Sequence, residues 1–196
     1  ESHVLAGGDP VSLLDDIERE HDNIRAALGW SLSTGARELA LRLAASLRPY
    51  WEVRGHLEEG RRWLAAVLDG PDTSPPELRA KAVGVSGTLA FHSGDLAAAE
   101  AYFSETLALF RQLGDADGIA RGLSDLGTVA AAVGDLERAG ELLEQSAGRF
   151  RELGERKRLA IALANLGHVA GQQSDFVTAA SVTAEALAIQ AELGDK

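Results

Sequence analysis

LGTVAAAVGDLERAGELLEQSAGRFRELGE, residues 126–155, contains the pattern that decides the fold. In Gly134-Asp135, the glycine readily takes the left-handed conformation that ends a helix, and the aspartate carboxylate can cap the first amides of the next helix. Leu153-Gly154 ends the following helix in the same way. Between these two marks the apolar residues recur at helical spacing, at Leu136, Ala139, Leu142, Leu143 and Ala147. The stretch therefore predicts antiparallel helices joined by a tight turn.

The same marks recur along the chain with a fixed period of 40 residues. Three sets share this period: Gly94-Asp95-Leu96, Gly134-Asp135-Leu136 and Ser174-Asp175-Phe176; Leu113-Gly114-Asp115, Leu153-Gly154-Glu155 and Leu193-Gly194-Asp195; and Gly87-Thr88, Gly127-Thr128 and Gly167-His168. A shared period predicts stacked helical hairpins. The glycines of the third set lie inside helices, where each costs about 1 kcal/mol relative to alanine. We therefore expect close contact between helices at these positions.

The composition excludes several classes of protein. The 196 residues are 45% hydrophobic, mostly Ala and Leu, which favours an all-α fold with a packed core. The net charge of −11 argues against a nucleic-acid-binding surface. The absence of cysteine excludes disulfides and Cys-ligated zinc. No apolar stretch is long enough to cross a membrane, and no signal peptide is visible, so we expect a cytoplasmic protein. The absence of methionine predicts a fragment of a longer protein.

The repeats resemble the tetratricopeptide repeat (TPR). The positions that carry the resemblance are Leu126-Gly127, Ala130, Gly134-Asp135-Leu136, Ala139 and Leu143, with equivalents in the repeats on either side. The departures are alanine where the family often has tyrosine, and a 40-residue instead of a 34-residue period. The resemblance implies an α-solenoid, a right-handed superhelix of antiparallel helix pairs. We expect three regular repeats within 75–196, at 75–115, 116–155 and 156–196.

The N-terminal third carries a weaker pattern. Residues 1–34 are expected to form an N-terminal segment with one amphipathic helix over 11–33, whose acidic residues and His21 make a solvated face. Residues 35–74 fit a degenerate first repeat, in which Pro49 should kink a helix. Trp30, Trp51 and Trp63 are expected to pack in the interior of this part, with Tyr50 and Trp51 beside Pro49 as the best candidates for an exception that opens toward a groove.

Two segments of this part, Leu14–Leu28 and Tyr50–Leu64, resemble large bacterial regulators. In those LuxR-type and antibiotic-regulator-type transcription factors, a signalling ATPase is followed by helical repeats, and a DNA-binding domain lies at one end. The resemblance implies that this chain is the regulatory region of such a protein.

No motif points to catalysis. The chain lacks a glycine-rich phosphate loop ending in Gly-Lys-Ser/Thr and a Gly-x-Ser-x-Gly motif. Its five histidines do not show the His-x3-His spacing of a zinc site. We therefore expect no catalytic residue, no metal and no cofactor.

If the repeats follow the TPR geometry, the first helix of each lines a concave groove. The predicted groove residues are Lys81, Thr88, Phe91, His92, Arg121, Ser124, Thr128, Asn165, His168 and Gln172, with Tyr50 and Trp51 beside the Pro49 kink as an aromatic addition. Their donors and small side chains suit a polar peptide or a small polar effector.

Two functions stay open at this point. The first is a non-catalytic domain of a bacterial transcription regulator that binds a protein or senses an effector. The second is a free-standing TPR scaffold that recruits a peptide or assembles as a homo-oligomer. An enzyme would need a site that the sequence does not show.

Overall fold

The computed structural model describes residues 10–70 and 74–194, and this part of the chain is helical without any strand. The all-α prediction is confirmed. The eleven helices of the described residues are α1 (Pro10–Arg19), α2 (His21–Ser33), α3 (Arg37–Ser46), α4 (Arg48–Arg54), α5 (Leu57–Leu68), α6 (Pro76–His92), α7 (Leu96–Leu113), α8 (Ala116–Ala132), α9 (Leu136–Leu153), α10 (Arg156–Gln172) and α11 (Phe176–Gly194). They form two compact units, residues 1–93 and 94–196. The units divide inside the predicted repeat 75–115.

The helix ends follow the glycine and aspartate marks. Gly134 has a φ of 86°, and it ends α8 in the left-handed conformation that glycine adopts without strain. Asp135 then accepts a hydrogen bond from the Arg138 amide at 3.3 Å, and Asp115 accepts one from the Gly118 amide at 2.9 Å. These carboxylates satisfy amides that have no partner within their own helix. The predicted stop and cap are thus confirmed.

Ser174 occupies the turn position that glycine holds in the other repeats. Its φ is 64°, the one positive φ of a non-glycine residue in the described ranges. Asp175 still caps α11, accepting a hydrogen bond from the Thr178 amide at 3.1 Å. The turn between α10 and α11 therefore keeps the shared geometry with a side chain in a strained conformation.

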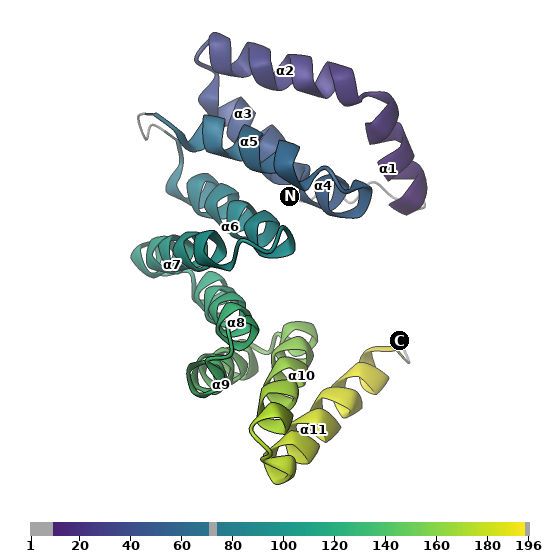
Figure 1. The fold of residues 1–196 in the computed structure, drawn as a ribbon, viewed down its shortest axis with the longest axis vertical. Helices are drawn as coiled ribbons and strands as arrows, with labels where there is room; N and C mark the ends of the chain where they lie inside the picture. The colour runs from purple at the N-terminus through teal and green to yellow at the C-terminus, as the bar shows by residue number, and fades with distance from the viewer. Residues whose placement is uncertain (1–9, 71–73, 195–196) are drawn as a thin grey trace. The chain divides into compact units, whose positions relative to one another are not determined.

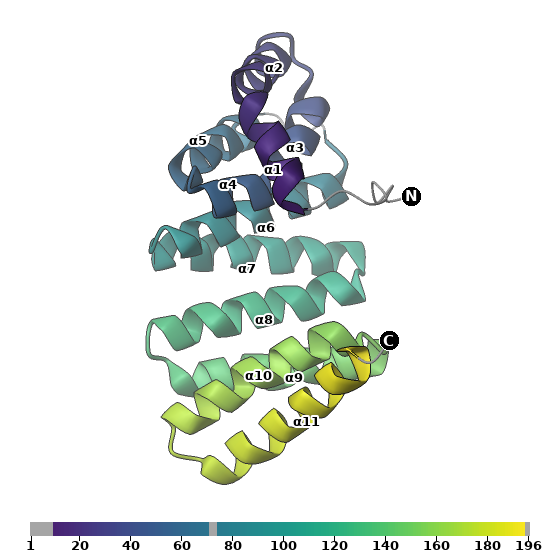
Figure 2. The same ribbon diagram turned by 90° about the vertical axis from the view of Figure 1, so that its right-hand side faces the viewer.

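In the unit formed by residues 94–196, each helix packs on its neighbours in the chain (Figure 2). Ala120, Ala147, Phe150, Leu159 and Leu163 belong to one buried cluster that joins α8, α9, α10 and α11. The expected close contact at the helix-interior glycines is confirmed at Gly127, where an added Cβ would lie 2.8 Å from Leu143 Cγ. Glycine is therefore retained there because α9 leaves no room for a side chain.

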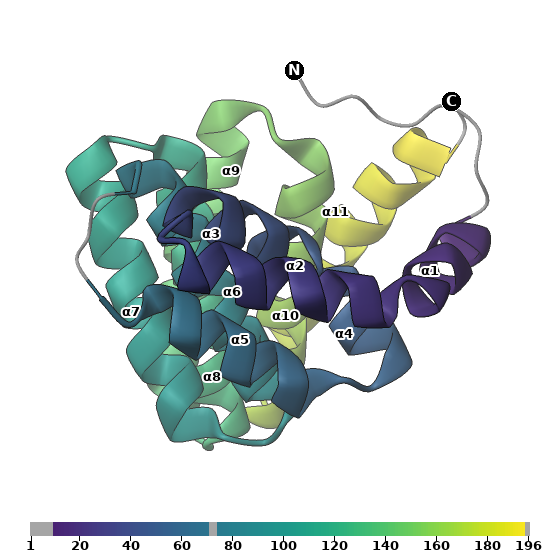
Figure 3. The ribbon, with the colours of Figure 1, turned by 90° about the horizontal axis from the view of Figure 1, so that it is seen from above.

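In the unit formed by residues 1–93, α2 packs on α3 and α5 (Figure 3), and α5 and α3 pack on α6. The core of this unit contains Leu28, Leu41, Leu64 and Leu89 together with Trp51. Trp63 is partly buried against the same core. The prediction that the tryptophans pack inside is confirmed for Trp51 but wrong for Trp30, whose side chain is 59% exposed.

The single helix predicted over 11–33 is wrong, because the chain breaks at Glu20 into α1 and α2, which meet at an angle (Figure 1). No proline or glycine marks this break. Leu14 and Ile17 of α1 pack on the same core as Ile24 of α2, and polar contacts from Glu18 and His21 reach α4 and α5. Tertiary contacts, and not local propensity, therefore set the break.

The kink expected at Pro49 is a full helix break two residues earlier, at Leu47. Pro49 lies in the first turn of α4, where a missing amide hydrogen costs nothing because it would have no partner there. Residues 71–73 lie outside the described residues, as does Asp195 of the last predicted mark.

Candidate functional site

Four of the predicted groove residues lie on α6. Lys81 and His92 are exposed, and Thr88 and Phe91 are half-buried. The Thr88 hydroxyl donates to the Gly84 carbonyl at 3.1 Å, within its own helix. His92 Nε2 lies 3.8 Å from Glu52 Oε1. This part of the predicted face is thus accessible, with a single aromatic side chain.

The other six predicted groove residues lie on α8 and α10 (Figure 2), and the structure brings them together. The Asn165 amide of α10 donates to the Thr128 hydroxyl of α8 at 3.5 Å, so the two helices present adjoining polar positions. One turn further along α10, Gln172 Nε2 lies 3.2 Å from His168 Nε2. The remaining two, Arg121 and Ser124, lie on α8, exposed and half-buried respectively. This set is named the α8–α10 face.

One carboxylate orients two arginines beside the α8–α10 face. Asp117 accepts a hydrogen bond from Arg121 Nε at 3.0 Å and a second from Arg158 Nη1 of α10. The Arg121 guanidinium also lies 5.1 Å from the centre of the Phe110 ring. Arg158 Nη1 also donates to Glu155 Oε2 at 3.2 Å, so two arginines face two carboxylates and this end of the face carries no excess charge.

Tyr50 and Trp51 do not belong to a groove. Each side chain is only 1% exposed, and both lie in the core of residues 1–93. The prediction that Pro49 opens these aromatics to a ligand is therefore wrong, because the break at Leu47 directs them inward.

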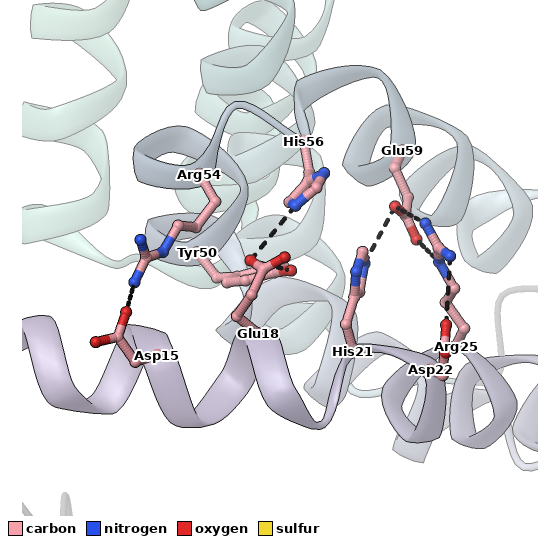
Figure 4. A network of polar contacts seen from close by, with 9 residues as sticks. All are labelled: Asp15, Glu18, His21, Asp22, Arg25, Tyr50, Arg54, His56 and Glu59. Atoms are coloured by element: carbon pink, nitrogen blue, oxygen red, sulfur yellow. Dashed lines mark hydrogen bonds and ion pairs between the residues drawn. The ribbon is translucent and has the colours of Figure 1, made fainter.

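A polar cluster that the sequence did not predict lies where α1, α2, α4 and α5 meet (Figure 4). It consists of Glu18, His21, Tyr50, His56 and Glu59. The Tyr50 hydroxyl donates to Glu18 Oε2 at 2.9 Å, and His56 Nε2 lies 3.6 Å from the same oxygen. The His21 and His56 ring centres are 4.8 Å apart. His21 was expected on a solvated face, and that prediction is wrong.

Glu59 is the charged centre of this cluster. Arg25 binds its two oxygens with Nε at 2.6 Å and Nη2 at 2.7 Å, and Trp63 Nε1 donates at 3.3 Å. The hydrogen bonds from Arg25 lower the pKa of Glu59 to about 2. Burial and the hydrogen bond to Glu18 raise the pKa of Tyr50. The hydrogen bond from Tyr50 lowers the pKa of Glu18, so both carboxylates of the cluster are ionised at neutral pH.

The cluster draws its residues from the two segments that resemble bacterial regulators, Leu14–Leu28 and Tyr50–Leu64. Their likeness was visible in the sequence, but the contact between them was not. A search for spacing within one helix misses His21 and His56, because they are 35 residues apart.

The sequence profile of the tetratricopeptide repeat matches residues 79–147 and 118–192, which together cover more than half of the chain. The chain belongs to the tetratricopeptide repeat family. The family prediction from the glycine and aspartate marks is confirmed.

Three proteins named as HTH-type transcriptional regulators, two from Mycobacterium tuberculosis strains and one from Mycobacterium bovis, are each 32% identical over 127 residues. The match covers 61% of this chain and 14% of each relative, so the chain spans about a seventh of their length. This likeness agrees with the resemblance to bacterial regulators found in the sequence.

Solved TPR-like structures share the fold. BtubC from P. vanneervenii matches with a TM-score of 0.74 at 16% identity, covering 90% of this chain and 74% of that protein. The apo form of RapI matches with a TM-score of 0.72 at 12% identity, covering 81% of this chain and 58% of that protein. A Rap protein complexed with Competence and Sporulation Factor matches with a TM-score of 0.67 at 16% identity, covering 82% of this chain and 44% of that protein.

In the described ranges, no helix has both the length and the apolar composition to cross a bilayer.

Proposed function

We propose that this chain is a non-catalytic, cytoplasmic TPR domain that binds a protein or peptide and serves as the regulatory region of a bacterial transcription regulator. The observation that carries the proposal is the α8–α10 face, where Thr128, Asn165 and His168 present hydrogen-bonding groups from adjoining helices. The names of the mycobacterial relatives and the Rap complex support the choice of partner class.

The face suits a polar ligand with hydrogen-bond donors and acceptors. Asn165 and Gln172 supply amide donors and acceptors, and Arg121 supplies a guanidinium at one end. In the regulator, a partner that binds one state of the protein more tightly shifts the population toward that state. A small polar effector would act through the same residues and the same differential affinity.

The test is a peptide-display selection against the 196-residue chain, followed by affinity measurements on the selected peptides by fluorescence anisotropy. We expect Asn165→Ala and Arg121→Ala each to weaken binding at least about tenfold, the loss of one or two charge-assisted hydrogen bonds. The matched control is Glu141→Ala, an exposed position on α9 away from this face. Selected peptides that bind both face variants as tightly as the parent chain would refute the proposal.

A homo-oligomeric scaffold is the second candidate, favoured by the exposed apolar side chains of α11. Val177 is 83% exposed and Leu187 is 60% exposed. Leu187 occupies the repeat position of Ala147, which is buried at 3% exposure in a cluster shared with α10. Light scattering that shows a stable multimer of this chain, lost in Leu187→Ser, would favour this function. A monomer at high concentration would exclude it.

A further inference from the structure

The polar cluster brings together three side chains that can bind a metal ion. One oxygen of Glu18 and one nitrogen each of His21 and His56 lie within 4.8 Å of one another. We propose that these three residues form a binding site for a divalent transition metal, with zinc as the first candidate. The site goes beyond the protein-binding function and does not depend on it.

The chemistry of the ligands selects the class of metal. Two imidazoles and one carboxylate suit zinc and its neighbours in the first transition row, whereas magnesium and calcium prefer oxygen ligands alone. Zinc binds nitrogen and carboxylate oxygen at about 2.0–2.2 Å, so two ligand atoms of one ion lie at most about 4.4 Å apart. Glu18 Oε2 and His56 Nε2, 3.6 Å apart, already satisfy this limit. The three ligand atoms all lie within 4.8 Å of one another, so the widest pair must draw closer to hold one ion.

The charge balance of the cluster favours a cation. Arg25 neutralises Glu59 through two hydrogen bonds. Glu18 instead accepts a hydrogen bond from the uncharged hydroxyl of Tyr50. Because metal-bound imidazoles are neutral ligands, Glu18 is the negative charge that would face the ion.

Glu59 lies where it can accept a hydrogen bond from a metal-bound His21. A metal-bound imidazole usually donates its other N–H to a carboxylate, which fixes the orientation of the ring. His21 Nε2 is buried and lies 3.2 Å from Glu59 Oε2, but the angles there do not make a hydrogen bond. In the proposed site His21 binds the metal through Nδ1, and Nε2–H turns to donate to Glu59.

The fold explains why the three ligands converge. Glu18 lies in the last turn of α1 and His21 begins α2, so the break at Glu20 presents both toward the same neighbour. His56 precedes α5, directly after Gly55, which ends α4 in the left-handed conformation. A bound ion would tie the break between α1 and α2 to the turn between α4 and α5.

The test uses the metal-free chain without a histidine tag. In isothermal titration calorimetry we expect one zinc ion per chain and no heat with magnesium. His56→Asn and Glu18→Gln should each weaken zinc binding at least about tenfold, since even outer-shell changes cost 10-fold or more. The matched control is Glu141→Gln, an exposed glutamate of α9 outside the cluster, which should bind zinc as the parent does.

Imidazole NMR of the unmodified chain keeps the test independent of how the variants fold. Added zinc should shift the ring nitrogen signals of His21 and His56, and leave those of His92 and His168 in place. No binding at millimolar zinc, shifts confined to His92 or His168, or full affinity in a folded His56→Asn would each overturn the proposal.

Discussion

Replacing Gly127 and Gly140 by alanine, one at a time, should affect the free energy of unfolding differently. Both glycines lie inside helices, so each substitution gains about 1 kcal/mol of helix propensity. At Gly140 of α9 nothing lies within 4 Å of the added Cβ, and the full gain should appear. At Gly127 of α8 the Cβ would lie 2.8 Å from Leu143 Cγ and 3.4 Å from the Ala139 carbonyl oxygen.

Overpacking of this kind costs about 1–3 kcal/mol, which offsets or exceeds the propensity gain at Gly127. We therefore expect the two variants to differ by about 1–3 kcal/mol in the free energy of unfolding, with Gly140→Ala the more stable. Urea unfolding followed by circular dichroism at the helix band measures this difference. If Gly127→Ala stabilises the chain as much as Gly140→Ala does, the close approach of α9 does not explain the glycine.

Three further predictions concern the helix ends. Ser174→Gly should stabilise the chain by up to about 1 kcal/mol in urea unfolding, because it removes the side chain from a left-handed conformation; a loss of stability would contradict the strain. Asp115→Ala should cost about 1 kcal/mol, whereas Glu155→Ala should have a much smaller effect in the same assay, because Glu155 makes no side-chain cap to its helix. Hydrogen bonds from Thr178 lower the pKa of Asp175, so its stabilising effect is present above about pH 4 and is lost as the pH falls through its folded-state pKa. Asp175→Asn should therefore reduce the loss of thermal stability on acidification, and an unchanged pH profile would refute this.

Local signals were sufficient to predict the regular repeats. The turn at Gly134-Asp135 depends on residues within a few positions of it, and the same backbone conformation recurs at Gly94 and Ser174. The close approach at Gly127 was also predictable, because an internal glycine has a cost that only packing explains.

The N-terminal part was less predictable because tertiary contacts determine it. Glu20 carries no helix-breaking signal, and the break follows from packing and polar contacts on both sides of it. Trp30 and Trp51 look alike in the sequence, but one is exposed and the other buried. The polar cluster required knowing which turn of α1 meets the start of α5, and a single sequence does not contain that information.

The similar joints between helix pairs have a consequence for how such genes change. Leu113-Gly114-Asp115 and Leu153-Gly154-Glu155 lie 40 residues apart, and Gly114 and Gly154 share one backbone conformation. Unequal recombination between the gene segments that encode these two joints would delete or duplicate one whole helical hairpin. An intact joint would form at the point of recombination, the seam. Length variation among homologues should therefore come in steps of 40 residues, with the seams at these glycines.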